Sequence, residues 1–176
     1  LHEQIEEHFS DGAKFGCQIL YLREDPATPL GTGGPLAMLE DIYPDLDASV
    51  LVLNGDLVTQ FNVADLLESH KESGSSLTIG VVSYTHEVPF GVLELSDVGL
   101  VSAISEKPII EKMVSAGIYA CEPRILRSLP RGQFMPMTRI IDESLSRGEE
   151  VSIWNCDNEW SDIGRPQDLA RAKGHV

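Results

Sequence analysis

Leu51-Val52-Leu53-Asn54-Gly55-Asp56 is the stretch of this sequence that decides the fold. The aliphatic run 50–53 is unbroken and rich in β-forming residues, which is typical of a strand covered on both faces. The run stops at Gly55, and Asp56 follows directly. Because ligands of open α/β sheets collect at the carboxyl ends of strands, the position favours a functional carboxylate. Asn, Gly and Asp also favour turns, so a simple turn is the other interpretation.

On either side of this strand, helical and strand-like patterns alternate. A loop rich in Pro and Gly covers 25–35, and a hairpin is expected about Asp97-Val98-Gly99. Alternation with one inserted hairpin predicts an α/β fold with a mixed, mainly parallel sheet flanked by helices. Helices are expected at 1–9, 36–42, 63–73, 123–128, 138–147 and from 166 onward, and further strands at 17–22, 76–83, 90–95, 100–105, 113–120 and 151–155.

Length and charge restrict the function. A chain of 176 residues has the size of one domain, so a single domain over 1–176 is expected. The formal net charge of −15 would repel a nucleic-acid backbone or an anionic membrane. No signal-peptide pattern and no apolar stretch approaching about 18 residues is present. A phosphorylated small substrate remains compatible with this charge if a metal or backbone N–H groups bind it.

The cysteines and histidines show no metal-ligand spacing. Cys17, Cys121 and Cys156 are odd in number, far apart and set in apolar surroundings, which predicts reduced core thiols. A cytoplasmic location is the corresponding expectation. The five histidines are interpreted as surface residues.

A glycine-rich segment, Leu30-Gly31-Thr32-Gly33-Gly34-Pro35, precedes an expected helix. Missing side chains let backbone N–H groups approach a ligand, and a helix N-terminus favours anions. A dinucleotide fingerprint needs a preceding strand and a third glycine, but Pro26 and Pro29 precede this segment and Leu36 takes the third glycine's place. A nicotinamide-dependent oxidoreductase is therefore disfavoured.

Ser105-Glu106-Lys107-Pro108 closes an expected strand with two opposite charges. Neighbouring strand residues point to opposite faces, and Pro108 ends the ladder. Glu106 could accept hydrogen bonds from sugar hydroxyls, and Lys107 could offer a point charge to a phosphate. A solvated strand end is the alternative interpretation.

A second isolated acid, Asp162, lies in the turn-like segment 159–166 before an expected helix. Pro166 near a helix start is ordinary and needs no function. Asp56 and Asp162 nevertheless both stand at strand or turn ends and not on a helix face. Two oxygen ligands that leave room for water and phosphate are the usual way in which proteins hold Mg²⁺.

Taken together, these motifs resemble the sugar-1-phosphate nucleotidyltransferases, also called nucleotide-sugar pyrophosphorylases. The resemblance covers essentially the whole chain and is closest to the bacterial branch with mannose-1-phosphate guanylyltransferase-like proteins. The motifs occur in the order and approximate spacing of that family: Leu30-Gly31-Thr32-Gly33-Gly34-Pro35-Leu36, Leu53-Asn54-Gly55-Asp56, Phe90-Gly91-Val92, Glu106-Lys107-Pro108, Ser115-Ala116-Gly117-Ile118-Tyr119 and Trp160-Ser161-Asp162-Ile163-Gly164.

The resemblance implies a Rossmann-like sheet, a transferase of nucleotide-sugar biosynthesis and a reaction between a nucleoside triphosphate and a sugar 1-phosphate that releases pyrophosphate. It implies Mg²⁺ as cofactor, and homo-oligomers are common in the family. The roles that it implies are metal binding and catalysis for Asp56 and Asp162, catalysis and sugar-phosphate binding for Lys107, nucleotide binding for Gly31, Thr32 and Gly33, and sugar binding for Gly91, Glu106, Ser115 and Gly117.

Two departures from the family pattern qualify the resemblance. Many relatives carry Asn at the position of Ser115, so the sugar is not identified. The family's opening strand and its signature Gly-rich loop with an Arg do not occur in this chain. We therefore expect an amino-terminally truncated domain that lacks its first strand, with activity in the parent protein and not in this chain alone. The rival from another class is a non-catalytic nucleotide- or sugar-binding regulatory domain of the same fold.

Overall fold

The computed structural model describes residues 2–156, 160–164, 168–170 and 173. Their contacts divide the chain into two compact units. The first unit comprises Leu1–Asp47 and Leu126–Glu143, and the second comprises Ala48–Ile125 and Ser144–Val176. The expectation of a single domain stays a prediction.

The first unit begins with α1 (His2–Phe9), as the sequence predicted, followed by the 3₁₀ turn η1 (Ala13–Phe15). The helix expected at 36–42 is instead the 3₁₀ segment η2 (Gly34–Met38) followed by the short α2 (Leu39–Ile42).

The prediction of a strand at 17–22 is wrong, because these residues adopt no regular secondary structure. Their hydrogen bonds run to the turn that follows α1: the Ile19 amide donates to the Asp11 carbonyl at 2.8 Å, and the Tyr21 hydroxyl donates to the Ser10 carbonyl at 2.6 Å. A strand needs a paired neighbour, and alternation in the sequence cannot supply one.

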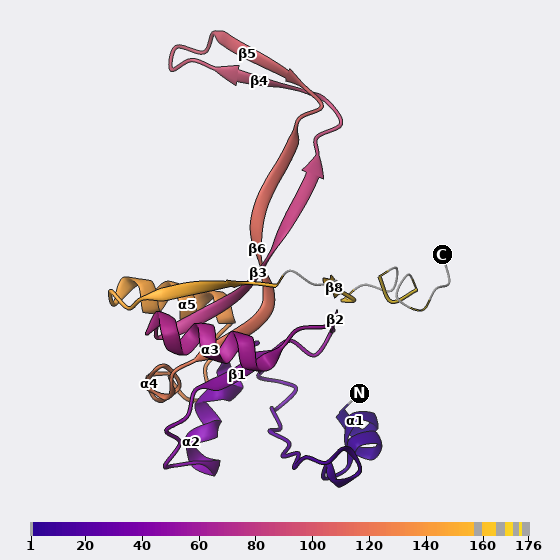
Figure 1. Ribbon diagram of the computed structural model, residues 1–176, viewed down its shortest axis with the longest axis vertical. Coiled ribbons are helices and arrows are strands. Elements are labelled where there is room, and N and C mark those ends of the chain that lie inside the picture. The colour runs from indigo at the N-terminus through magenta and orange to yellow at the C-terminus, as the bar shows by residue number, and fades with distance from the viewer. Residues whose placement is uncertain (1, 157–159, 165–167, 171–172, 174–176) are drawn as a thin grey trace. The chain divides into compact units, whose positions relative to one another are not determined.

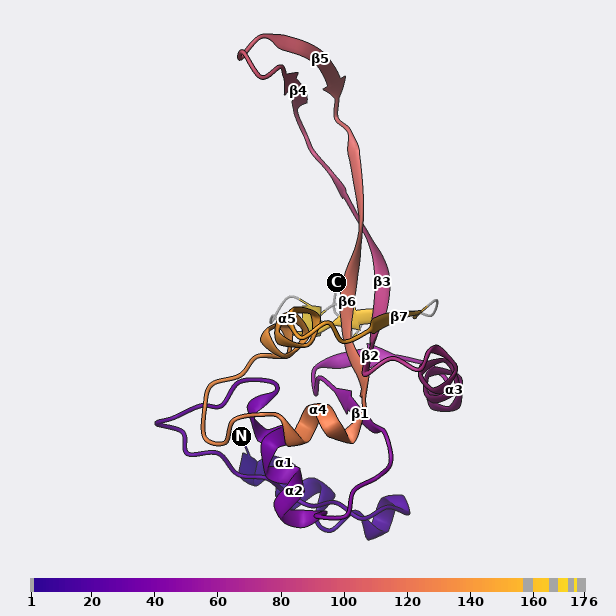
Figure 2. The ribbon, with the colours of Figure 1, turned by 90° about the vertical axis from the view of Figure 1, so that its left-hand side faces the viewer.

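A four-stranded sheet with the order β1-β6-β3-β7 belongs to the second unit (Figures 1 and 2). The strands are β1 (Val50–Leu53), β3 (Leu77–Glu87), β6 (Ile109–Cys121) and β7 (Val151–Asn155). Strands β1 and β3 run antiparallel to β6, and β7 runs parallel to β3. Three of the four strands therefore share one direction, and the sheet is mixed, as expected.

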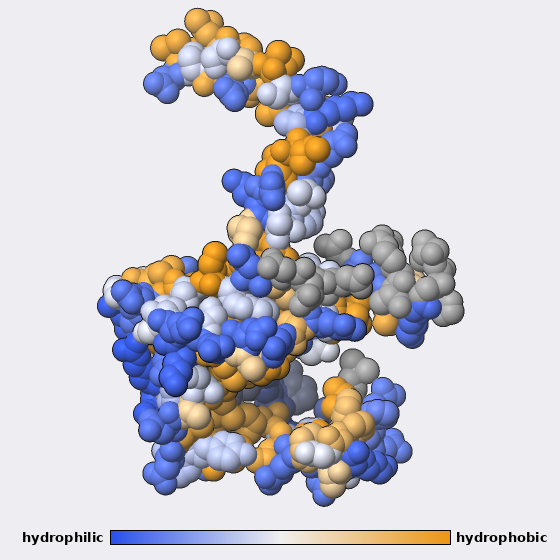
Figure 3. Space-filling view, viewed as in Figure 1, coloured by the Kyte–Doolittle hydropathy of each residue, from blue (hydrophilic) through white to orange (hydrophobic). Residues whose placement is uncertain are grey.

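Strands β3 and β6 are longer than the sequence predicted. Their ladder runs from Leu77 opposite Cys121 to Glu87 opposite Ile109 and continues well past the buried part of the sheet (Figure 2). It leads into the predicted hairpin of β4 (Gly91–Leu95) and β5 (Val101–Glu106). The hairpin carries exposed apolar side chains, visible as orange atoms over β4 and β5 in Figure 3.

Helix α3 (Val63–Ser73) has the bounds that the sequence predicted. The Asn62 side chain accepts a hydrogen bond from the Ala64 amide, and Gly74 ends the helix in the left-handed conformation at φ 66°. Leu66 is fully buried against Ala116, Ile118 and Ala120 of β6. Helices α4 (Pro123–Arg127) and α5 (Met137–Ser146) follow β6 in the chain.

Two predictions about side chains need correction. His70 is not a surface residue: it is 2% exposed, and its ring lies between the Thr78 hydroxyl at 2.6 Å and the Glu122 carboxylate at 3.1 Å. Cys17 is not a core thiol, since it is exposed, whereas Cys121 and Cys156 are buried and all three thiols are free.

Among the described residues, none of the helices combines the length and the apolar character that crossing a membrane requires. The helix expected from residue 166 falls largely outside the described residues, which show a helical conformation at 168–170.

Candidate functional site

The candidate site is centred on the turn that follows β1. Asn54, Gly55 and Asp56 connect β1 to the short strand β2 (Leu57–Thr59). The Asn54 amide donates to the Gly117 carbonyl at 2.9 Å, and the Asp56 carbonyl accepts from the Ile163 amide at 2.9 Å. The turn is therefore held from two sides, and the Asp56 side chain remains exposed at the carboxyl end of β1.

Strand β2 brings in the second acid. It pairs antiparallel with β8 (Trp160–Asp162), so that Leu57 lies opposite Asp162. Neither strand was expected from the sequence, which indicated only a turn at 159–166. Three residues are too few for a hydrophobic period to be recognised, and the pairing is visible only in three dimensions.

The carboxylates of Asp56 and Asp162 approach the same point. A Cβ atom built on Gly164 would lie 3.0 Å from Asp162 Oδ1 and 3.5 Å from Asp56 Oδ2. Asp162 Oδ1 also accepts a hydrogen bond from the Gly164 amide at 2.9 Å. Gly164 thus leaves space beside both acids that a side chain would fill. No group of three or more His, Cys, Asp or Glu side chains suited to a metal gathers within the described part of the chain.

Ser115 and Gly117 lie in an irregular part of β6, residues 115–118, which we call the β6 bulge. Ser115 Oγ donates to the Tyr119 hydroxyl at 2.9 Å and accepts from the Gly117 amide at 3.3 Å. Ser115 Oγ therefore has two partners within β6. Gly117 has φ 74°, and a Cβ there would lie 2.7 Å from the Asn54 side chain.

Gly91 and Glu106 are cross-strand partners in the β4–β5 hairpin. A Cβ on Gly91 would lie 3.2 Å from Glu106 Oε2, so the missing side chain leaves this carboxylate accessible. Lys107 follows β5 with φ 47° and an exposed side chain, while its amide donates to the Phe90 carbonyl at 3.3 Å. Lys107 thus has a left-handed backbone conformation in the connection between β5 and β6.

The hairpin residues and the two acids lie near different ends of β6. Leu53, just before the Asp56 turn, is opposite Ile118, whereas the β3–β6 ladder ends toward the hairpin at Ile109. The register therefore groups Asp56, Asp162 and Gly117 together, and Gly91 with Glu106. Lys107 adjoins the second group.

The glycine-rich segment belongs to the first unit, and close packing explains its composition. A Cβ on Gly33 would lie 2.4 Å from Ile140 Cδ1, and one on Gly31 would lie 3.0 Å from the Phe134 ring. The Gly33 amide donates to the Met135 carbonyl at 2.8 Å, and Thr32 Oγ1 accepts from the Met137 amide at 2.9 Å. These contacts give the segment a structural role besides the nucleotide binding that its motif predicts.

Two cavities lie away from the predicted site residues. One, of about 500 Å³, lies in the second unit beside His70, Lys71, Glu122 and Arg124, and the other, of about 520 Å³, lies in the first unit beside Ile5, Tyr21 and Arg23. Gly91, Glu106 and Lys107 line neither of these two cavities.

Asn54 and Trp160 are positioning candidates that sequence reasoning treated only as parts of motifs. The Trp160 indole N–H donates to the Ala116 carbonyl at 2.9 Å, and the Asn54 side chain fills the space beside Gly117. Both residues are visible in the sequence, but the groups that accept their hydrogen bonds are the Ala116 and Gly117 carbonyls, and backbone groups carry no sequence signal.

Comparison with known proteins assigns the family. The family described as "Nucleotidyl transferase" matches residues 1–176. The UTP--glucose-1-phosphate uridylyltransferase of Synechocystis is 30% identical over 98% of this chain and 48% of that protein. The mannose-1-phosphate guanylyltransferase of Mycobacterium tuberculosis is 29% identical over 98% of this chain and 48% of that protein. The chain thus spans about half the length of these relatives.

Solved structures share the fold. A putative glucose-1-phosphate thymidylyltransferase from Bacillus anthracis, in complex with a sucrose, superposes with a TM-score of 0.71 at 20% identity and covers 98% of this chain and 70% of that one. HddC from Yersinia pseudotuberculosis superposes with a TM-score of 0.66 at 22% identity, covering 96% and 72%. The Rossmann-like architecture expected from the motifs is confirmed. Since the family match extends over its whole length, this chain belongs to the nucleotidyl transferase family.

Proposed function

We propose that the protein containing this chain transfers a nucleotidyl group from a nucleoside triphosphate to a sugar 1-phosphate, forming a nucleotide sugar and pyrophosphate. Family membership and the names of the relatives support this class of reaction. The observation that carries the proposal is the approach of Asp56 and Asp162 to one point beside Gly164 at the carboxyl end of β1.

The donor set fits Mg²⁺. Asp56 and Asp162 are exposed carboxylates on adjacent segments, and hard oxygen ligands with space for water and phosphate suit this ion. When bound there, Mg²⁺ would offset negative charge on the phosphates. Gly164 keeps the adjoining space free of a side chain.

The other residues would bind and orient the sugar 1-phosphate. Glu106 would accept hydrogen bonds from sugar hydroxyls beside Gly91, and Lys107 would place its ammonium on the sugar phosphate, as the motif implies. The register places these three residues at the hairpin end of β6, so a shared substrate with Asp56 and Asp162 requires the hairpin to come closer to the two acids. A sugar-phosphate oxygen would attack the α-phosphorus in line, and pyrophosphate would leave without a covalent enzyme intermediate. Positioning and charge compensation carry the catalysis of such transfers.

The first prediction tests the two acids. Asp56→Asn and Asp162→Asn keep side-chain volume but remove a metal-binding charge, so each should lower turnover by roughly 10²-fold or more. Pyrophosphate release is measured over a matrix of nucleoside triphosphates and sugar 1-phosphates on the full-length protein.

Asp97→Asn is the matched control, because Asp97 is an exposed acid in the β4–β5 turn. Its turnover should remain that of the wild type. Full activity of both Asp56→Asn and Asp162→Asn would refute the metal assignment, and no release with any substrate pair would refute the proposed reaction.

A further inference from the structure

The β6 bulge is the common attachment point of the two segments that carry Asp56 and Asp162. On β3, Ile79 pairs with Tyr119 and Val81 pairs with Ser115, so Ala116, Gly117 and Ile118 all lie opposite Gly80. This irregularity turns backbone groups of the bulge away from the β3 ladder and leaves them free for other partners.

Two consecutive carbonyls of the bulge are used in this way. The Ala116 carbonyl accepts the Trp160 indole N–H at 2.9 Å, and the Gly117 carbonyl accepts the Asn54 amide at 2.9 Å. Trp160 begins β8, which ends at Asp162. Asn54 lies two positions before Asp56. Each acid is therefore tied to the bulge through a neighbour two residues away.

The hydrogen bond from the Trp160 indole to the Ala116 carbonyl has a buried acceptor, so water cannot replace it. Ala116 is 0% exposed, so its carbonyl cannot exchange the indole N–H for water. Trp160 also packs against the core cluster of Leu66, Ala116 and Ile118. Strand β8 is only three residues long and pairs with the equally short β2. A two-stranded ribbon of this size is not stable alone, so its position depends on such an anchor.

We propose that Trp160 is a positioning residue that fixes the Asp162 carboxylate relative to Asp56 by holding β8 on the β6 bulge. The role of the two acids in metal binding rests on the proposed function. Because Ser115 and Gly117 belong to the same bulge, the anchor also couples the metal-binding acids to the predicted sugar-binding residues.

The second prediction tests the anchor with metal alone. Trp160→Phe keeps the aromatic packing and removes the indole donor. Replacement by 3-benzothienylalanine keeps the ring shape as well and serves if the phenylalanine variant is unstable. Losing one hydrogen bond to a buried acceptor should weaken Mn²⁺ binding about five- to tenfold in both variants. Electron paramagnetic resonance of free Mn²⁺ measures this on the full-length protein.

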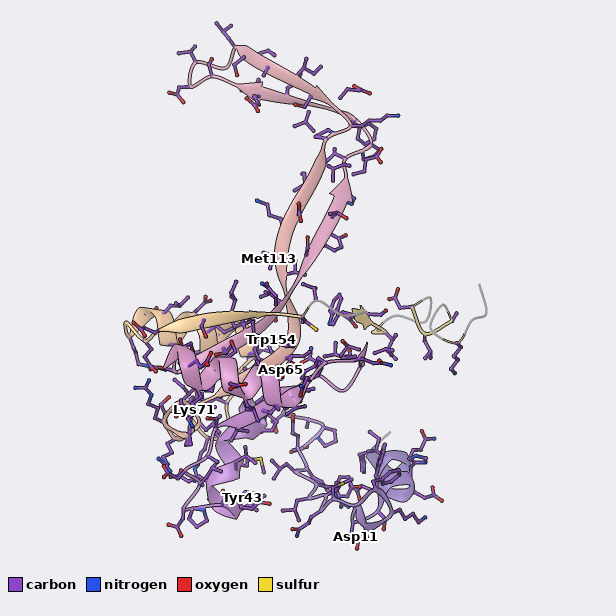
Figure 4. All side chains as sticks on the ribbon, in the orientation of Figure 1. Asp11, Tyr43, Asp65, Lys71, Met113 and Trp154 are labelled. Carbon is purple, nitrogen blue, oxygen red and sulfur yellow. The ribbon has the colours of Figure 1, made fainter. Side chains whose placement is uncertain are left out.

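The chain offers a matched control in Trp154→Phe. Trp154 on β7 (labelled in Figure 4) packs against Phe61 with ring centroids 5.8 Å apart and belongs to the same core cluster. This variant loses comparable packing but should bind Mn²⁺ like the wild type. The Mg²⁺ concentration for half-maximal turnover should rise in the Trp160 variants and not in Trp154→Phe. A purely structural role for Trp160 would instead change both tryptophan variants alike.

The outcomes separate the two proposals. If Asp162→Asn abolishes Mn²⁺ binding but the benzothienylalanine variant binds Mn²⁺ like the wild type, the anchor alone is refuted. Nucleotidyl transfer without any Mn²⁺ bound by Asp56 and Asp162 would refute both the anchor and the metal site. Weakened Mn²⁺ binding in the Trp160 variants, with Trp154→Phe unchanged, would support the anchor even if no substrate pair were turned over.

Discussion

At the scale of single residues, burial decides what the three cysteines can do. Cys17 is exposed, whereas Cys121 is fully buried at the end of β6. Burial, assisted by the negative charge of Glu122, raises the pKa of Cys121 from 9.0 to about 12. The thiolate is the nucleophile of cysteine chemistry, so Cys121 is inert at neutral pH while the protein is folded.

The third prediction concerns thiol labelling. At pH 8, Cys17 should react with a disulfide reagent within minutes, and Cys121 should react only after unfolding. Above the unfolded pKa the unfolded state releases a proton that the folded state keeps, so the free energy of unfolding falls as pH rises from about 9 toward 12. Peptide mapping of the labelled protein shows which cysteine has reacted, with Cys17→Ser as control. Fast labelling of Cys121 in the native protein would contradict its burial.

At the scale of elements, a buried polar network joins α3 to the sheet. His70 Nδ1 contacts Thr78 Oγ1 at 2.6 Å, and Thr78 Oγ1 contacts Ser152 Oγ of β7 at 2.7 Å. On the other side of the ring, Nε2 faces Glu122, which also accepts the Ser49 hydroxyl at 2.7 Å. Satisfied networks of this kind favour one arrangement of helix and strands, because every alternative leaves a buried polar group unpaired.

The fourth prediction removes the centre of this network. Thr78→Val keeps side-chain shape but leaves the ring nitrogen of His70 buried without its partner, so the free energy of unfolding should fall by about 1 to 3 kcal/mol. Urea unfolding measures the loss.

The control is the same substitution on the same strand: Thr85→Val, where the side chain is exposed, should change stability by less than about 0.5 kcal/mol. Equal stability of the two variants would show that the Thr78 hydroxyl contributes nothing net.

At the scale of the whole chain, the net charge of −15 opposes the approach of anionic substrates. The proposed reaction joins two phosphorylated molecules, so long-range repulsion should lower its second-order rate constant. Salt screens this repulsion, with a Debye length of about 10 Å at 0.1 M.

The fifth prediction follows from this screening. Raising monovalent salt from about 0.01 to 0.1 M should increase kcat/KM for the sugar 1-phosphate at saturating Mg²⁺ while kcat stays nearly constant. Stopped-flow or initial-rate measurements in KCl and in tetramethylammonium chloride separate screening from a specific K⁺ effect. A monotonic fall of kcat/KM in both salts would show that local cations such as Lys107 dominate the approach.

The sequence by itself determined those elements whose signals are local. Helix α3 was predicted with its bounds because its apolar positions and Gly74 are all within one segment, and the β4–β5 hairpin was predicted from its turn residues. The run before Asp56 indicated both a strand and a carboxylate at its end, and the ordered motifs indicated the family that the comparison then confirmed.

Only the tertiary structure decided features that depend on a distant partner. Strands β2 and β8 exist because they pair with each other. The strand expected at 17–22 is absent because the hydrogen bonds of this segment go to the turn after α1. His70 can be buried because Thr78 and Glu122 are hydrogen-bond partners of its ring nitrogens. The proximity of Asp56 to Asp162 likewise depends on backbone carbonyls of the β6 bulge, which every residue type presents. A sequence records side chains, but pairing, burial and backbone contacts arise only when segments far apart in the chain meet.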